Sequence, residues 1–257
     1  MGKMVNISHG HALPGGEGCG AVGFHDESKE TKAITEKLVQ MLNKNGIESH
    51  DCSCNKHIDW SVCLNEIIAK HNSYPGEDLS VSLHLNYYKG KTQKDGKNKG
   101  VEVLVYSESG SSYKMEVAHR ILDAFEDAGF TVRGIKERPD LRFLAKCKSP
   151  SILVEMYFCD DEDDCLLAEK YGHKGLARLL AEGITGKQIR DISYGTEVKI
   201  KGTVKIRDSK TSDYNKVGVL YPGTVVEVLE TNKACTRGRI TSKHWITLDA
   251  RYVDVVE

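Results

Sequence analysis

The sequence lacks any long run of apolar residues, and this absence excludes several classes of protein. No stretch of its 257 residues approaches the ~20 consecutive apolar residues that a membrane-spanning helix needs. The first residues also lack the apolar segment of a secretory signal peptide, because MGK is followed by a short strand-like run and then by polar residues. We therefore expect a globular protein that is made in the cytoplasm and does not insert into a membrane.

The sequence also lacks the cysteine spacing of a structural zinc site. Cys52 and Cys54 are separated by one residue rather than by about two to four, and no second Cys or His pair lies at a matching distance. In a reducing cytoplasm we expect most of the eight cysteines to be buried free thiols. Internal repeats and low-complexity tracts are absent as well.

Strand and helix patterns alternate over residues 1–186. Strand patterns occupy residues 4–8, 79–86, 99–107, 131–135 and 150–158, and helical patterns occupy 28–45, a segment starting near Asp59, 112–128 and 161–184. Asp59 is a suitable helix N-cap, and Gly46 follows the first helix where a C-terminal cap belongs. This alternation predicts an α/β domain of three layers, in which a twisted, mostly parallel sheet is flanked by helices.

The pattern changes after residue 186. We expect residues 187–193 to form a linker, because they separate the helical pattern from a region of short β-rich runs. Residues 194–257 contain these runs, which are broken by turn residues and include no helical pattern. Such a region predicts a small β-barrel as a second domain.

Polar side chains occur near the ends of three predicted strands, where ligands gather in α/β folds. His9 and His11 follow the first strand, and His84 lies near the end of strand 79–86. Glu155 lies within strand 150–158 among apolar residues, where an unpartnered carboxylate is costly. Glu27, at the start of the first helix, lies close to the exit of the first strand.

Two histidines and two glutamates at such positions can supply three ligands to a zinc ion and leave its fourth coordination position open for water. One carboxylate then remains that does not bind the metal. Each residue taken singly also has a structural explanation. Glu27 suits a helix N-terminus, His84 can be a hydrogen-bonded core histidine, and His11 can be a loop residue beside glycines. Glu155 is the most difficult to explain without a function, and the four residues together favour a metal site.

Four motifs follow one another in a fixed order along residues 4–185. They are the Gly-His pair at 10–11, the Gly-Ala pair at 20–21 before Glu27, SLHLN at 82–86 and PSILVEMYF at 150–158. In the family that these motifs resemble, a ligand glutamate begins a helix that ends in glycine about nineteen residues later, and Glu27 with Gly46 matches this spacing whereas Glu30 does not. In these motifs the chain resembles the zinc-dependent N-acetylmuramoyl-L-alanine amidases, in the branch of cell-wall autolysins and phage endolysins.

The resemblance implies one catalytic Zn²⁺ held by His11, Glu27 and His84, with Glu155 as the catalytic base and later acid. It implies hydrolysis of the amide between N-acetylmuramic acid and L-alanine in bacterial peptidoglycan, and it assigns no substrate-binding residue. The first loop departs from the family in its insertion-like GGEGC segment and in His25, which competes with Glu27 as a ligand. In the same motifs His9 has no assigned role, and we expect it to be a bystander.

The second region resembles bacterial SH3-like domains in VKIRDS (204–209), YPGTVVEVLE (221–230) and HWITLDARYV (244–253). This implies a cell-wall-binding module, and the alternative is a barrel that serves only stability or dimerisation. The whole chain then resembles an endolysin of a phage or prophage, made in the host cytoplasm without a signal peptide and acting on the wall after release. Peptidoglycan is the expected partner, and nucleic acid is not.

Two other functions stay open at this point. The first is a zinc endopeptidase or carboxypeptidase that cuts within the stem peptide, which is the same chemistry at another bond. The second is a non-catalytic protein that binds the wall through its second domain. The sequence does not identify the oligomeric state, the host or the ligand of the second domain.

Overall fold

The computed structural model describes residues 4–74, 79–189, 195–208, 215–232, 237–249 and 251–256. The chain divides into two compact units, and along the sequence the division follows Gln188. Most of the predicted linker 187–193 lies outside the described residues, and the domain bounds stay a prediction.

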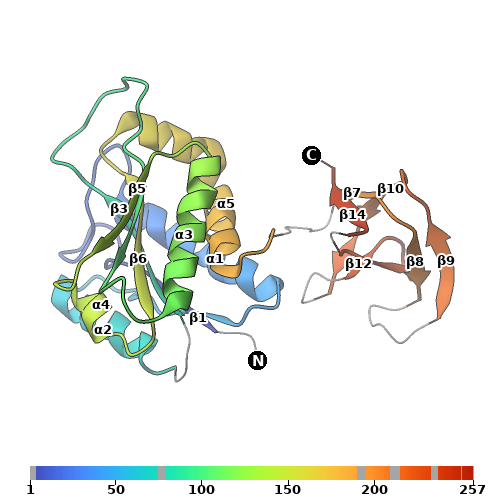
Figure 1. Ribbon diagram of the computed structural model, residues 1–257, viewed down its shortest axis with the longest axis horizontal. Coiled ribbons are helices and arrows are strands. Elements are labelled where there is room, and N and C mark those ends of the chain that lie inside the picture. Colours follow the sequence, from blue (N-terminus) through green and yellow to red (C-terminus); the bar gives the residue numbers. More distant parts are fainter. Residues whose placement is uncertain are drawn as a thin grey trace. The chain divides into compact units, whose positions relative to one another are not determined.

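A six-stranded sheet forms the centre of the first unit (Figure 1). Its order is β2 (Ser49–Asp51), β1 (Val5–His9), β3 (Leu79–Asn86), β6 (Ser151–Phe158), β4 (Val101–Val105) and β5 (Val132–Glu137). Neighbouring strands are parallel except for β4 and β6, which pair antiparallel. The predicted mostly parallel sheet is thus confirmed, with two strands at one edge reversed.

Helices cover both faces of this sheet (Figure 1). One side carries α1 (Glu27–Lys44), α3 (Ser112–Asp127) and α5 (Glu162–Thr185), and the other carries α2 (Trp60–His71) and α4 (Arg142–Lys146). The apolar positions of α2 and α4 pack with Leu104 and Leu153 of the sheet in one buried cluster. None of the helices in the described residues combines the length and hydrophobicity needed to cross a membrane.

The helix ends follow the sequence signals closely. The Asp59 side chain accepts hydrogen bonds from the backbone N–H groups of Ser61 and Val62, which confirms it as the N-cap of α2. Gly46 follows α1 with a φ of 78°, a backbone conformation that strongly favours glycine. The predicted helix 161–184 is interrupted instead, because Gly172 has a φ of 62° within α5.

Two short elements carry no periodic signal that a sequence pattern can reveal. They are β2, with three residues, and α4, with five residues. Helix α4 is important because it lies beside α2 at the candidate site, and no part of the sequence pattern predicted it.

The lysine-rich loop between β3 and β4 is held by the acidic residues around the start of α5. Asp160 accepts hydrogen bonds from the backbone N–H groups of residues 88–90, and Asp163 accepts them from those of residues 95 and 96. Asp164, which is fully buried, accepts one from Gly100. These acidic residues therefore fix a long loop in addition to favouring the helix N-terminus.

The second unit consists of two antiparallel sheets. One contains β10 (Val225–Val228), β7 (Thr196–Ile200) and β14 (Val253–Val255), in that order. The other contains β11 (Glu230–Thr231), β12 (Arg237–Arg239), β13 (Trp245–Thr247), β8 (Val204–Arg207) and β9 (Lys216–Leu220). Among its described residues, seven aliphatic side chains form a buried core, Ile246 among them. The predicted short strands are present, and their closure into an SH3-like barrel stays a prediction.

Candidate metal centre

Three side chains from distant parts of the sequence meet at the carboxyl-terminal ends of β1 and β3. His11 lies in the loop after β1, Glu27 is the first residue of α1, and His84 lies near the end of β3. Glu27 Oε1 is 3.2 Å from His11 Nε2 and 3.0 Å from His84 Nδ1. One potential ligand atom from each residue lies within 4.8 Å of the other two. In the described residues no other group of three or more His, Cys, Asp or Glu side chains has this geometry.

Two glycines allow these side chains to approach one another. A Cβ on Gly10 would lie 1.9 Å from the imidazole of His84, and a Cβ on Gly20 would lie 2.4 Å from a carboxylate oxygen of Glu27. Any side chain at either position would displace a member of the group. The Gly-His and Gly-Ala pairs seen in the sequence therefore have a steric explanation.

Backbone N–H groups position the Glu27 carboxylate, and the two histidines keep it ionised. Its Oε2 accepts a hydrogen bond from Ala21 N, and its Oε1 accepts one from Leu85 N. Burial opposes ionisation, but the hydrogen bonds and charges of His11 and His84 outweigh it, and the pKa of Glu27 lies well below its usual range. A buried anion between two imidazoles is a donor set that a divalent cation can use.

Glu155 lies on β6, the strand that pairs with the His84 strand β3, and it is outside the group of three. Its Cα is paired with that of His84 across β3 and β6, and with that of Glu102 across β4 and β6. Its Oε2 is inaccessible to solvent and has no hydrogen-bond partner in the described part of the chain. Burial and the negative charges of Glu27 and Glu102 raise its pKa well above the usual value, and Arg138 offsets this only in part. Glu155 is therefore the carboxyl group that is able to hold a proton beside the three clustered side chains.

The chain matches the N-acetylmuramoyl-L-alanine amidase family (Amidase_3) over residues 4–186. The protein belongs to this amidase family. The matched residues contain the whole first unit from β1 to α5 and all four of the side chains described above.

Solved structures of amidases share this fold. The catalytic domain of the CD27L endolysin targeting Clostridia difficile is 30% identical, covers 73% of this chain and 99% of its own, and has a TM-score of 0.62. The CwlD amidase from Clostridioides difficile, solved with the GerS lipoprotein, is 20% identical. It covers 72% of this chain and 97% of its own, with a TM-score of 0.58, and supports the fold alone.

Two curated relatives come from Clostridium perfringens, and both are uncharacterised. One, from strain 13 / Type A, is 27% identical over 229 residues, and the other, a 38.4 kDa protein, is 24% identical over 234 residues. The alignments cover 82% of this chain but only 65% of either relative.

Two further histidines of this amidase-family chain that the sequence brought into question, His25 and His9, lie apart from the group of three. His25 Nδ1 is 2.9 Å from the hydroxyl of Tyr157, and its Nε2 is 3.2 Å from a carboxylate oxygen of Glu169. Both ring nitrogens of His25 are thus engaged outside the group of three, in which Glu27 and not His25 is present. His9 is buried, with its Nε2 3.4 Å from Asn55 Oδ1, and it is not part of the group either.

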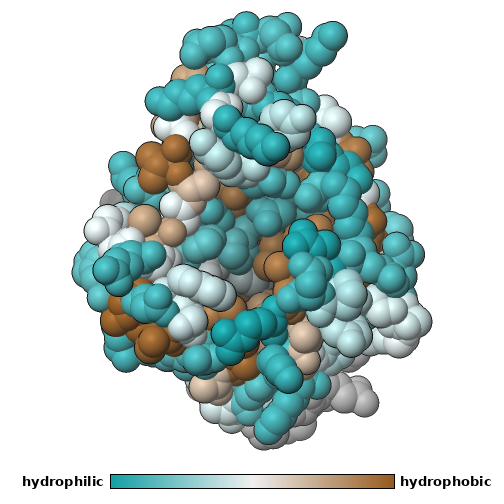
Figure 2. Space-filling view, turned by 90° about the vertical axis from the view of Figure 1, so that its left-hand side faces the viewer, coloured by the Kyte–Doolittle hydropathy of each residue, from teal (hydrophilic) through white to brown (hydrophobic). Residues whose placement is uncertain are grey.

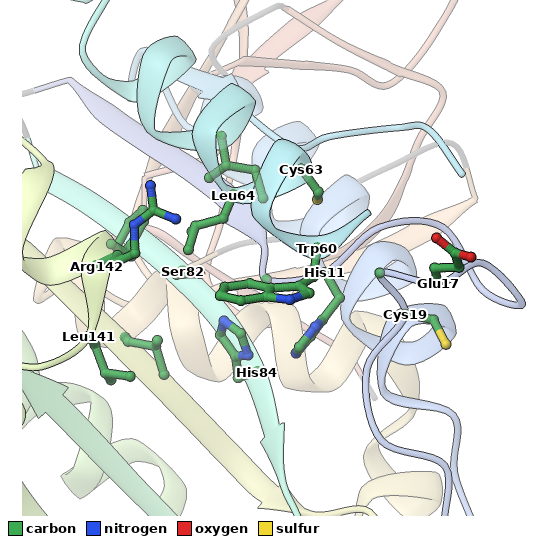
Figure 3. A pocket seen from close by; sticks show the side chains of 15 residues that line it. His11, Glu17, Cys19, Trp60, Cys63, Leu64, Ser82, His84, Leu141 and Arg142 are labelled. Carbon is green, nitrogen blue, oxygen red and sulfur yellow. The ribbon is translucent and has the colours of Figure 1, made fainter. Parts of the chain in front are cut away.

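A pocket of about 310 Å³ opens beside the two histidines of the group (Figure 3). Figure 2, which views the molecule from the side of α2 and α4, shows a hollowed surface at which hydrophobic and hydrophilic residues lie together. Besides His11 and His84, the pocket is lined by residues of the loop 10–19, α2 and α4, including Trp60, Leu64, Leu141, Arg142 and Phe143. The sequence predicted Leu64 only as an inward-facing helix residue and assigned no functional role to any of the five, since their approach depends on packing between α2 and the unpredicted α4.

Cys52, Cys54 and their neighbours form no group with metal-ligand geometry among the described residues. Cys52, Cys54 and Cys63 are buried free thiols, as are the other cysteines that the structure describes, apart from the half-buried Cys19 and Cys147. Burial raises the pKa of Cys52 and of Cys63 to about 12, so both thiols stay protonated at neutral pH.

Proposed function

We propose that this protein is a zinc-dependent peptidoglycan hydrolase that cleaves the amide bond between N-acetylmuramic acid and L-alanine. The observation that carries the proposal is the meeting of His11, Glu27 and His84 beside the protonatable Glu155, at one side of an open pocket. The family match supports the reaction, and the likeness to the CD27L catalytic domain supports a lytic role of the endolysin type.

The donor set fits zinc. Two imidazoles and one carboxylate match the His₂Glu ligands of several catalytic zinc sites, in which a fourth position is left for the reaction. A Zn²⁺ ion held here would act as a Lewis acid toward the amide carbonyl oxygen and would make water more acidic.

Glu155 performs the proton transfers in this proposal. As a base it takes a proton from the attacking water, whose oxygen forms the new bond to the lactyl carbonyl carbon. It then gives that proton to the nitrogen of L-alanine as the C–N bond breaks, because an amine anion is a poor leaving group. The raised pKa of Glu155 favours the protonated form that this second step needs, whereas the first step needs the carboxylate form.

The second unit is proposed to be an SH3-like module that binds the cell wall. Its antiparallel strands support this assignment, and its exposed aromatic residues Tyr221 and Tyr252 are available for a ligand. With it, the protein would be synthesised in the host cytoplasm and act on the wall after release.

Digestion of purified peptidoglycan tests the reaction. New amino termini should belong to L-alanine, whereas an endopeptidase or carboxypeptidase would release amines of inner stem residues. A non-catalytic wall-binding protein would release none. Metal analysis of the purified protein should find about one zinc per chain, and full activity after complete zinc removal would contradict the proposed site.

A further inference from the structure

The pocket beside the candidate metal centre has two chemically different ends. Leu141 and Arg142 line one end, Glu17 and Cys19 line the other, and His11, His84 and Trp60 lie between them in Figure 3. A substrate whose amide is held at the histidines must therefore extend toward a cation on one side and toward a carboxylate on the other. This difference can fix the direction in which the substrate lies.

Arg142 has hydrogen-bonding capacity that the protein does not use. One guanidinium N–H donates to Asn65 Oδ1, and the exposed side chain has no carboxylate within 4.0 Å in the described part of the chain. Three other arginines of this unit are different, because Arg120, Arg133 and Arg138 each pair with a carboxylate. A guanidinium beside an otherwise mainly apolar wall is suited to a planar anion such as a carboxylate.

Trp60 is an aromatic surface held in place beside the same histidines. Its side chain lines the pocket although the residue is 56% exposed. The Asp59 cap fixes the first turn of its helix, and Gly18 packs so closely that a Cβ there would lie 3.0 Å from Trp60 N. The loop that carries His11 therefore sets the position of Trp60, and a large exposed aromatic side chain at a pocket is typical of a ligand contact.

The stem peptide of peptidoglycan has the matching chemistry. On the L-alanine side of the scissile amide, the second residue is a glutamate linked through its γ-carboxyl group, and its α-carboxyl group is either free or amidated. The glycan side presents uncharged sugar rings. Glu17 would repel the peptide carboxylate at the opposite end of the pocket, whereas Arg142 would attract it.

We propose that the stem peptide lies toward α4, packed against Trp60 and Leu141, and that Arg142 recognises the free α-carboxylate of its second residue. The inference rests on the proposed function, whose site and scissile bond it uses. It predicts that the protein distinguishes wall peptides with a free carboxylate from those with a carboxamide at this one position.

The experiment compares two soluble muropeptides that differ only in this carboxylate or carboxamide. Calorimetric titration into zinc-loaded Glu155→Gln protein gives each dissociation constant without turnover. The carboxylate form should bind roughly tenfold more tightly. Adding Arg142→Gln to the Glu155→Gln protein should remove this preference, because it should weaken the binding of the carboxylate muropeptide only. Adding Arg142→Lys should keep part of the preference. Arg178→Gln is the matched control, because Arg178 is exposed on α5 and does not line the pocket.

Two results would overturn the inference: equal affinities in the parent protein, or an equal loss for both forms in the Arg142→Gln variant. The second would mean that Arg142 only supports the shape of the pocket. Trp60→Ala should weaken both forms equally, and Trp60→Phe should restore most of the affinity. The proposed function fails separately, if wild-type protein releases no L-alanine amine from peptidoglycan while the Arg142-dependent preference persists.

Discussion

The two units of this protein bury different kinds of side chain. The core of the second unit is aliphatic, with residues such as Val228 and Ile246. The first unit also buries ionisable groups, among them Glu27, His71 and Asp164. Because burying such groups is costly unless they are paired, each of them indicates a specific task or partner. The first unit therefore carries its chemistry inside the fold, whereas any binding by the second unit must use its surface.

The contacts of these buried ionisable groups show which parts of the structure they hold in place. Glu27 contacts both histidines of the candidate metal centre, and Asp164 accepts the N–H groups that fix Gly100 and Phe158. Glu155, which lies beside the group of three, differs from Glu27 because its Oε2 has no partner among the described residues. This comparison can be tested by substitutions in each unit.

The largest effect is expected from Glu155→Gln. The amide preserves the size of the side chain but cannot take a proton from water, so hydrolysis should fall by about 10³-fold. Release of L-alanine amines from peptidoglycan measures this loss, and metal content and wall binding should be unchanged. A rate within tenfold of the wild type would contradict the role of Glu155.

A substitution in the second core should separate the two units. Ile246 is fully buried, and Ile246→Ala should destabilise its unit by about 2–5 kcal/mol. Wall binding should then be lost at a lower temperature, while hydrolysis of a soluble muropeptide stays at the wild-type rate. Val255→Ala is the control, since Val255 is 40% exposed. Equal loss of both activities in Ile246→Ala would show that the units do not function separately.

His71 should give the first unit a pH-dependent stability. Its ring nitrogens lie 3.0 Å from Ser80 Oγ and 3.1 Å from Ser8 Oγ, and burial lowers its pKa to about 3. Below about pH 6.5 the unfolded chain therefore binds a proton that the folded protein does not, and stability falls as the pH decreases.

The pH dependence that His71 causes is measured as the difference in unfolding free energy between the wild type and the His71→Asn variant. This difference should shrink by about 2 kcal/mol from pH 6.5 to pH 5. Comparing the two proteins removes opposing contributions, such as that of Asp164, whose pKa burial raises to about 6. His119→Asn, at an exposed position of α3, is the matched control for replacing a histidine by asparagine. A constant difference for His71→Asn would refute the assignment.

The smallest effect is expected from His9→Gln. Because His9 contacts Asn55 and lies outside the group of three, hydrolysis should stay within about threefold of the wild type. His11→Gln should instead lose both metal and activity. Zinc content measured beside the rate separates the two positions, and zinc loss in His9→Gln would assign His9 to the metal site.

Much of the first unit could be predicted because its signals are local. Strand alternation, the Asp59 cap and the glycine after α1 depend on near neighbours in the sequence, and they predicted the elements within a few residues. The pocket could not be predicted in this way. Trp60 and Arg142 are ordinary surface residues in sequence, and α4 is too short to give a periodic signal.

The sequence alone determined three things: the alternation of strands and helices, the change near residue 187 to short β-rich runs, and the set of residues with metal-binding chemistry. Only the tertiary structure decided which of them share a site. His11, Glu27 and His84 meet because parallel strands end at the same edge of a sheet, and two glycines leave room for them. His25 is directed elsewhere by Tyr157 and Glu169, which lie more than a hundred residues away in the chain. Local patterns specify backbone conformation, but side chains so far apart are brought together only by packing.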